Sequence, residues 1–242
     1  IIVLIVLISL LFIFLWNLYI TRKRKFPNIE SSKLPFVSVL IPARNEQDNI
    51  EQCVLSLNEQ DYPHYEIVVL NDHSTDRTGN ILSELQSKLP DLKIINGEEL
   101  PAGWIGKSFA CHQLTQSAKG DWLLYTDADT IHNRNSIRTG VETALKRNAD
   151  LLSVVPHQIT KTFSEKLVIP ILHFITFSLL PFYFLEKKGY KKFTIAVGQY
   201  MLFKRSSLEK IGGYESVKNE MVEDVSMGKL IKKNNMQLIV LN

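Results

Sequence analysis

Cysteine is scarce in this chain, and so is an excess of charge of one sign. Cys53 and Cys111 are the two cysteines among 242 residues, and their spacing fits no metal or redox motif. Residues 22–25 hold four of the 28 basic residues, which leaves 24 basic against 25 acidic residues. A nearly neutral body lacks the basic surface that nucleic-acid binding requires. We therefore expect no nucleic-acid partner and two reduced, packed thiols, as in a cytosolic domain.

Glycine is missing from the first predicted strand–helix turn, which reads "IPARNEQDNI" at residues 41–50. This turn is therefore neither the G-x-G-x-x-G turn of dinucleotide-binding folds nor the P-loop of nucleoside triphosphatases. A nucleotidyltransferase is also disfavoured, because we expect such an enzyme to open with a glycine-rich, basic phosphate loop. If the chain binds a nucleotide, a metal ion must hold most of its diphosphate.

Charge is absent from residues 1–20, an apolar run long enough to cross a bilayer as a helix. Trp16 and Tyr19 stand near its end, as aromatic anchors at a membrane surface do, and the basic run follows. A cleaved signal peptide fits poorly, because the run is too long and no small-residue cleavage site follows. We expect a transmembrane anchor at residues 1–21 and a basic juxtamembrane linker at residues 22–35. The positive-inside tendency then places the remaining domain on the cytoplasmic face of the cell (inner) membrane.

Apolar runs alternate with helix-like segments over residues 36–242. The expected strands are residues 36–42, 65–72, 92–96, 121–127, 149–156 and 236–242. Asn45 is a plausible N-cap of the first helix, Ser74 or Thr75 of the second, and Gly120 is a stop signal for the third. Strands that are nearly continuous apolar runs indicate an α/β fold, with a mostly parallel sheet covered by helices on both faces.

Polar, acid-bearing loops follow three of these strands, at residues 43–46, 71–76 and 127–132. In a parallel sheet such loops share one rim, where ligands bind. Asp127 and Asp129 would point the same way from an extended segment, and they would repel each other unless a cation joined them. The pair indicates either a solvated turn or half of a site for Mg²⁺ or Mn²⁺, ions held by one or two carboxylates plus substrate phosphates. Asp72 on the neighbouring loop could accept the N–H of a uracil ring.

Six motifs follow one another along the chain: "VLIPARNEQDNI", "VVLNDHSTDRT", "GWIGKSFA", "LLYTDADT", "VGQYMLFKRSSLEKIGGY" and "VEDVSMGKLI". In this order they resemble the inverting glycosyltransferases of family 2, which have the GT-A fold, over about residues 36–242. "LPAGWIGK" resembles in particular the membrane-bound subgroup associated with hopanoid and carotenoid glycosylation. The resemblance implies transfer of a sugar from a nucleotide diphosphate donor, usually UDP-linked, to an acceptor hydroxyl or carboxylate.

The resemblance also implies roles for individual residues. Asp224 matches the family's general base, which takes a proton from the acceptor. Asp129 matches the ligand of a Mg²⁺ or Mn²⁺ ion on the diphosphate, and Asp127 faces ribose or metal. The other implied donor contacts are Pro42, Ala43, Arg44 and Glu46 at the nucleotide, Asp72 at its base, Lys107 at the nucleotide or its phosphates, and Gly198, Gln199 and Tyr200 beside the sugar.

These assignments have structural alternatives. Asp224 could complement the dipole of a helix that begins there. Arg44 could be a surface charge, and Gln199 a buried amide. Asp76 is expected to belong to the first turn of a helix, and His132 to be a solvated loop side chain.

Residues 168–185 form a second apolar stretch without Asp, Glu, Lys or Arg. A single bilayer crossing here would put Asp224 and Asp127 on opposite sides of the membrane, and Pro170 and Pro181 argue against a straight helix. We expect an interfacial or re-entrant segment, with a buried core helix as the alternative. Four lysines follow it and could meet anionic headgroups: Lys187, Lys188, Lys191 and Lys192. Membrane contact beside the site favours a lipid or membrane-associated acceptor.

The sequence departs from the family in lacking a C-terminal Gln-x-x-Arg-Trp-type motif, so we expect a truncated C-terminus. Two other classes of function remain open. One is a non-catalytic GT-A-fold scaffold in envelope lipid or polysaccharide assembly, and the weaker one is a nucleotidyltransferase.

Overall fold

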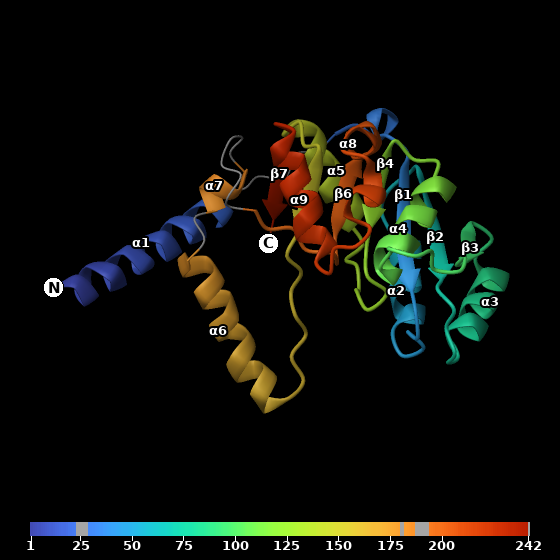
Figure 1. Cartoon of the computed structure of the whole chain (residues 1–242), viewed down its shortest axis with the longest axis horizontal. Helices are drawn as coiled ribbons and strands as arrows, with labels where there is room; N and C mark the ends of the chain where they lie inside the picture. The colour runs from blue at the N-terminus through green and yellow to red at the C-terminus, as the bar shows by residue number, and fades with distance from the viewer. Residues whose placement is uncertain (23–28, 180–181, 187–193, 242) are drawn as a thin grey trace.

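A seven-stranded sheet forms the centre of the protein (Figure 1). The computed structural model describes residues 1–22, 29–179, 182–186 and 194–241. The strands are β1 (Val37–Ala43), β2 (Tyr65–Asn71), β3 (Leu92–Asn96), β4 (Trp122–Tyr125), β5 (Leu151–Val154), β6 (Met201–Lys204) and β7 (Leu238–Leu241). Five of them lie within the ranges expected from the sequence, and β1 extends one residue beyond its expected range.

The sheet is mostly parallel, as predicted. Its order is β3-β2-β1-β4-β6-β5-β7, and β1 pairs in parallel with both β2 and β4. Strand β6 was not predicted, and it runs antiparallel to both of its neighbours, β4 and β5. It lies inside the "VGQYMLFKR" motif, so that motif supplies sheet structure as well as residues near the rim.

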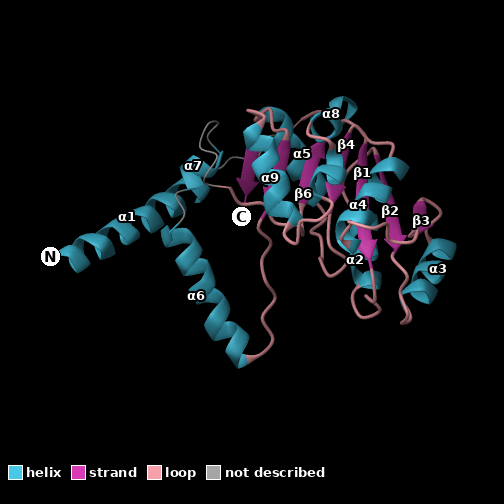
Figure 2. Cartoon of the chain, in the orientation of Figure 1, coloured by secondary structure: helices cyan, strands magenta, loops and turns pink. Residues whose placement is uncertain are grey.

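Helices cover both faces of the sheet (Figure 2). One face carries α2 (Ile50–Asn58), α3 (Thr78–Lys88) and α5 (Ser136–Lys146), and the other carries α4 (Gly106–Ser117), α8 (Arg205–Lys210), the 3-10 helix η2 (Gly213–Val217) and α9 (Glu223–Lys233). Alternation along β1 divides its side chains between two cores, because Val39 and Ile41 pack on the first face and Leu40 on the second. The buried sheet fixes the positions of the loops that follow its strands.

Three local predictions about helix ends were wrong. Residue Asn49, not Asn45, precedes α2, and Arg77, not Ser74 or Thr75, precedes α3. Asn45 instead has a positive φ of 57°, and its side chain accepts a hydrogen bond from the Thr75 backbone N–H at 2.8 Å. Helix α4 ends before Gly120, where a Cβ would lie 2.5 Å from the Ser38 backbone nitrogen. Glycine is needed there for close approach to β1 rather than as a helix stop.

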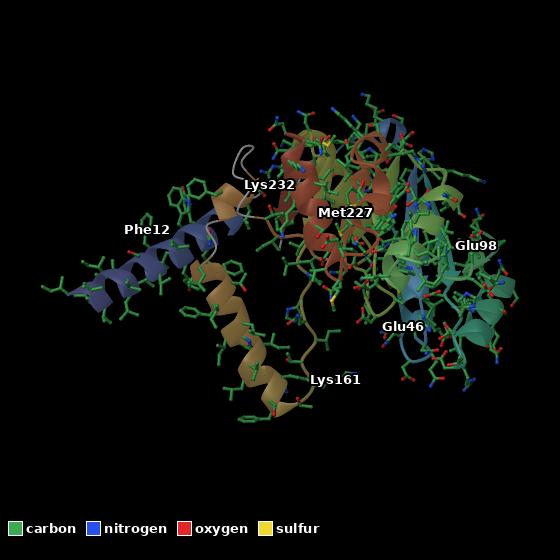
Figure 3. The ribbon with its side chains drawn as sticks, in the orientation of Figure 1. Phe12, Glu46, Glu98, Lys161, Met227 and Lys232 are labelled. Atoms are coloured by element: carbon green, nitrogen blue, oxygen red, sulfur yellow. The ribbon has the colours of Figure 1, made fainter. Side chains whose placement is uncertain are left out.

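Two apolar helices, α1 (Ile2–Arg22) and α6 (Phe163–Leu179), project away from the sheet (Figure 1). The rings of Phe14 and Phe174 lie 5.3 Å apart, and the Asn17 side chain donates to the Phe177 carbonyl at 2.7 Å. These contacts join the C-terminal half of α1 to the C-terminal end of α6. In the side-chain view, Phe12 on α1 and Lys161 before α6 lie far from the sheet (Figure 3).

Helix α6 contains Pro170, and most of its apolar side chains are exposed. A buried core helix was therefore the wrong alternative for this stretch. Within the described residues, Ile2–Tyr19 is the one segment long and apolar enough to cross a membrane. A short helix, α7 (Phe182–Glu186), leads back toward β7, and η1 (Ser31–Lys33) precedes β1. Residues 23–28 of the expected linker and the four lysines at 187, 188, 191 and 192 lie outside the described residues.

Candidate functional site

The loops after β1 and β2 are tied together by side-chain hydrogen bonds to backbone N–H groups. Ser74 accepts from the Asn45 N–H at 3.0 Å, and Thr78 accepts from the Glu46 N–H at 2.8 Å. Asp76 accepts from the N–H groups of Gln47 and Thr78, at 3.1 and 2.9 Å. Asp76 therefore organises the start of α3, as expected. The two loops form one rigid rim.

A cavity of about 330 Å³ opens at this rim. Its lining comes from the ends of β1, β2 and β4 and from the start of α4: Pro42, Ala43, Arg44, Glu46, Asp72, Gly106, Lys107, Ala110, Asp127, Ala128 and Asp129. Eight of the donor-site and metal-site residues expected from the sequence are in this set. The order of strands in the sheet brings them together, although up to 87 positions separate them along the chain.

Asp72 lies at one end of the cavity lining. It is mostly buried, its carboxylate lies 3.6 Å from the exposed Arg44 guanidinium, and its backbone N–H donates to the Ala43 carbonyl at 2.8 Å. A Cβ on Gly97 would lie 3.2 Å from Asp72 Oδ1, and one on Gly106 would lie 3.6 Å from Oδ2. Backbone without side chains thus packs against this carboxylate and leaves it facing the cavity.

Lys107 links the rim cavity to helix α9. Its Nζ lies 2.7 Å from Asp127 Oδ1 and 3.3 Å from Glu223 Oε1. Burial disfavours the charged amine, but Asp127 and Glu223 outweigh that effect and raise the pKa of Lys107 above its usual value. Glu223 was not predicted as a site residue. Its position beside Asp224 in "VED" was the available signal, but adjacency alone does not reveal which carboxylate faces Lys107.

Asp224 reaches the same place from the first turn of α9. Its Oδ2 accepts from the Gly198 N–H at 3.0 Å, and its Oδ1 accepts from the Val225 N–H at 2.6 Å. A Cβ on Gly198 would lie 3.2 Å from Lys107 Nζ, 3.7 Å from Asp224 Oδ2 and 3.8 Å from Asp127 Oδ2. The Asp127 carboxylate, just after β4, and the Asp224 carboxylate, on α9, therefore both lie next to Gly198.

Several neighbours lie outside this cluster. Tyr200 is buried and its hydroxyl donates to the Ser136 carbonyl, so its expected place beside the sugar was wrong. Gln199 is half-buried, and its backbone carbonyl accepts from the Thr126 hydroxyl. His132 is also buried, not solvated, and burial lowers its pKa to about 4.

The two cysteines are free and buried, as predicted. Burial raises the pKa of each thiol to about 12, and the Asp129 and Asp127 carboxylates add to the effect at Cys53. Both thiols are therefore protonated at neutral pH and are poor nucleophiles and metal ligands.

Asp127 and Asp129 fit a cation that is shared with a bound diphosphate. Asp129 is exposed at the cavity and makes no hydrogen bond or ion pair within the described part of the chain. That same part contains no group of three or more His, Cys, Asp or Glu side chains that could hold a metal alone. One or two carboxylates plus substrate phosphates is the donor set that Mg²⁺ commonly uses.

The model of glycosyl transferase family 2 matches residues 38–212 of the chain. The chain belongs to this family. It is 30% identical over 216 residues to the probable glycosyltransferase YdaM of Bacillus subtilis, covering 86% of this chain and 50% of the relative. It is 27% identical over 204 residues to the 4,4'-diaponeurosporenoate glycosyltransferase of Staphylococcus haemolyticus, covering 81% and 52%. The chain thus spans about half the length of these relatives.

Solved structures share the fold. The mannosyltransferase PcManGT from Pyrobaculum calidifontis, in complex with GDP-Man and Mn²⁺, superposes with a TM-score of 0.70 at 22% identity, covering 97% of this chain and 63% of that one. TarS 1-349 of S. aureus, in complex with UDP-GlcNAc, superposes with a TM-score of 0.56 at 21% identity, covering 85% and 56%. The GT-A fold expected from the sequence is confirmed.

Proposed function

We propose that this family-2 glycosyltransferase domain transfers a sugar, with inversion, from a UDP-linked donor to a lipidic acceptor at the cytoplasmic membrane face, with the help of Mg²⁺ or Mn²⁺. The observation that carries the proposal is that Asp127, which lines the rim cavity, and Asp224 both lie next to Gly198. Asp127 is expected to face the metal and Asp224 to act as the base. Between them they leave one place where a donor and an acceptor can meet.

The rim cavity supports the donor half of the proposal. Asp72 presents a carboxylate that can accept the N–H of a uracil ring, with Pro42, Ala43, Arg44 and Glu46 forming the adjacent wall. Asp127 and Asp129 would hold the cation, which when bound stabilises negative charge on the leaving diphosphate. Lys107 adds a protein cation next to Asp127. Gly198 lets the backbone lie close to Lys107 and Asp127, and Gln199 follows it on the expected sugar side.

Asp224 supports the acceptor half. An inverting displacement needs a carboxylate that takes the acceptor proton as the acceptor oxygen attacks the anomeric carbon. The N–H groups of Gly198 and Val225 hold the Asp224 carboxylate in place. The carboxylate lies in the first turn of α9, so the helix-dipole interpretation and the catalytic one are compatible.

The apolar helices support a membrane-associated acceptor. Helix α1 has the length and composition of a membrane span, and α6 contacts it through Phe174 and Phe177, near the C-terminal end of α6. This arrangement suits a span with an interfacial or re-entrant segment at its cytoplasmic end. The Staphylococcus relative is named for a carotenoid, and an acceptor of that class would stay dissolved in the bilayer.

A non-catalytic scaffold is the rival function. It would have no need for Asp72, Asp127 and Asp129 around one cavity with Asp224 close to Asp127, and nucleotidyl transfer would need the phosphate loop that the β1–α2 turn lacks. These features favour glycosyl transfer over both alternatives.

The test uses the full chain in vesicles of extracted membrane lipid, with labelled UDP-sugars and GDP-sugars in parallel. We expect label from a UDP-sugar to enter the organic phase in the presence of Mn²⁺ or Mg²⁺ but not after chelation. Asp129→Ala should abolish incorporation while leaving the thermal midpoint unchanged. Incorporation that persists in Asp129→Ala contradicts the metal role, and no incorporation or donor hydrolysis with any nucleotide sugar contradicts the activity. Transfer from GDP-sugars alone contradicts the assignment of UDP.

A further inference from the structure

Lys107 is shared by two carboxylates that belong to different halves of the site. Asp127 follows β4 and lies on the donor side, whereas Glu223 begins α9 one residue before Asp224. Glu223 is 12% exposed as a side chain, and Lys107 is its described ion-pair partner at 3.3 Å. An ammonium group has three donors, so one lysine can hold both acids or move from one to the other.

A divalent cation would compete with Lys107 for the Asp127 carboxylate. While Lys107 Nζ occupies Asp127 Oδ1 at 2.7 Å, that oxygen already has a positive partner. A divalent cation that binds Asp127 places more positive charge next to Lys107. Lys107 must then lose part of its interaction with Asp127. The charge of Lys107 needs another acceptor close by, because a partly buried ammonium without one is costly.

We propose that Glu223 is this acceptor: Lys107 acts as a built-in counter-ion of Asp127 in the empty site, and moves onto Glu223 when a divalent cation takes Asp127. This inference rests on the proposed function, in which Asp127 faces the cation. Glu223 is then a positioning residue that acts through Lys107. Gly198 allows the motion, since a side chain there would meet Lys107 Nζ at 3.2 Å.

The experiment measures Mn²⁺ binding to the full chain in detergent with saturating UDP, by the electron paramagnetic resonance signal of free Mn²⁺, corrected for the Mn²⁺ that UDP binds in solution. Lys107→Met removes the internal competitor, so we expect Mn²⁺ to bind about tenfold more tightly, the size of one charge-assisted hydrogen bond. Glu223→Gln leaves Lys107 with Asp127 alone, so Mn²⁺ should bind about tenfold more weakly. The inference therefore predicts that Lys107→Met and Glu223→Gln change the Mn²⁺ affinity in opposite directions, although the two residues form one ion pair.

The double variant separates transfer of Lys107 from simple loss of charge. Removing the Glu223 carboxylate would weaken cation binding through space in any case, with or without Lys107. If Lys107 mediates the effect, Glu223→Gln has little further effect in the Lys107→Met background. Glu223→Asp keeps the charge but shortens its reach, and it should weaken Mn²⁺ binding in the wild-type background. Glu220→Gln removes an exposed carboxylate three residues earlier and should leave Mn²⁺ binding unchanged.

The outcomes distinguish this inference from the proposed function. An equal effect of Glu223→Gln with and without Lys107 overturns the inference, as does unchanged or weaker Mn²⁺ binding by Lys107→Met. If wild type binds Mn²⁺ through Asp129, as judged by Asp129→Ala, the proposed function survives either result. If wild type binds no Mn²⁺ even with UDP present, the metal role and this inference both fail. Thermal midpoints of all variants establish that the comparison is made on folded protein.

Discussion

In the strands of the sheet the leucine side chains are buried, whereas on α1 and α6 the same residue type faces outward. Leu40 and Leu124 have no exposed surface, but Leu11 and Leu172 are each 55% exposed. In water such exposure forgoes about 25 cal/mol for each Å² of apolar surface. An apolar surface of this kind marks an interaction with a membrane or another apolar partner.

The difference assigns separate work to the two regions. The sheet domain holds charged groups in fixed relation, because its core is packed on both faces and its rim loops are bonded to each other. The helix pair is joined by ring contacts and by the Asn17–Phe177 hydrogen bond, its outer surface is apolar, and it would hold the domain at the membrane. A variant that affects one region should therefore leave the other unaffected, and three predictions test this.

The largest effect is expected from a variant that removes the proposed general base and changes nothing outside the sheet domain. Asp224→Asn keeps the shape of the side chain but cannot accept a proton, so kcat for a hydroxyl acceptor should fall by about a thousandfold. Membrane sedimentation and UDP affinity should stay as in wild type. Asp91→Asn, an exposed carboxylate before β3, is the matched control and should retain full activity. A loss smaller than tenfold with a hydroxyl acceptor contradicts the base assignment.

A matched pair of leucines tests the comparison itself. Leu124→Ala opens a cavity in the buried sheet and should lower the free energy of unfolding by about 2–5 kcal/mol. Leu11→Ala removes the same atoms from an exposed position, and it should change that free energy by less than about 0.5 kcal/mol. Urea unfolding in detergent, followed by near-ultraviolet circular dichroism, measures both. Equal destabilisation would show that α1 is part of the folded core.

The smallest effect is a pH dependence confined to the sheet domain. Burial lowers the pKa of His132 from 6.5 to about 4, so the unfolded chain binds a proton that the folded chain does not. The stabilisation is complete above about pH 6.5 and is lost as pH falls toward 4; between pH 7 and pH 5 it should decrease by about 2 kcal/mol. His132→Asn should flatten this dependence, whereas His157→Asn, at an exposed position, should not. An unchanged slope in His132→Asn rejects the account.

Much of the fold followed from the sequence because its strands are continuous apolar runs. That pattern correctly indicated a parallel sheet, and the rule that loops share the rim at the strand ends then brought Asp72, Asp127 and Asp129 together. Strand β6 is as short as β4, β5 and β7, which were predicted; it was missed because Met201–Lys204 lie inside a motif that was interpreted only as part of the donor site. Gly120 was misassigned because close approach to the Ser38 nitrogen depends on the neighbouring strand, not on the chain near the glycine.

The errors within the site have a similar cause. His132 lies in a polar loop of the sequence, but tertiary contacts bury it. The Ser56 hydroxyl accepts from the His132 backbone N–H, and the Ser136 hydroxyl is hydrogen-bonded to its ring. Glu223 and Asp224 are neighbouring acids in the sequence, but their side chains point in different directions. Glu223 faces Lys107, and Asp224 faces Gly198. Side-chain direction at a helix start depends on tertiary packing, which one sequence does not reveal.

A crystal structure of the full chain with UDP and Mn²⁺ tests the central claim most directly. We predict uracil beside Asp72, the metal on Asp129 at about 2.1 Å with the diphosphate completing its coordination, and Asp224 facing the open space next to Gly198. Nucleotide bound elsewhere, such as in the cavity between α2 and α3 lined by Gln47, Arg77 and Lys88, would contradict it. So would a metal held without Asp127 or Asp129.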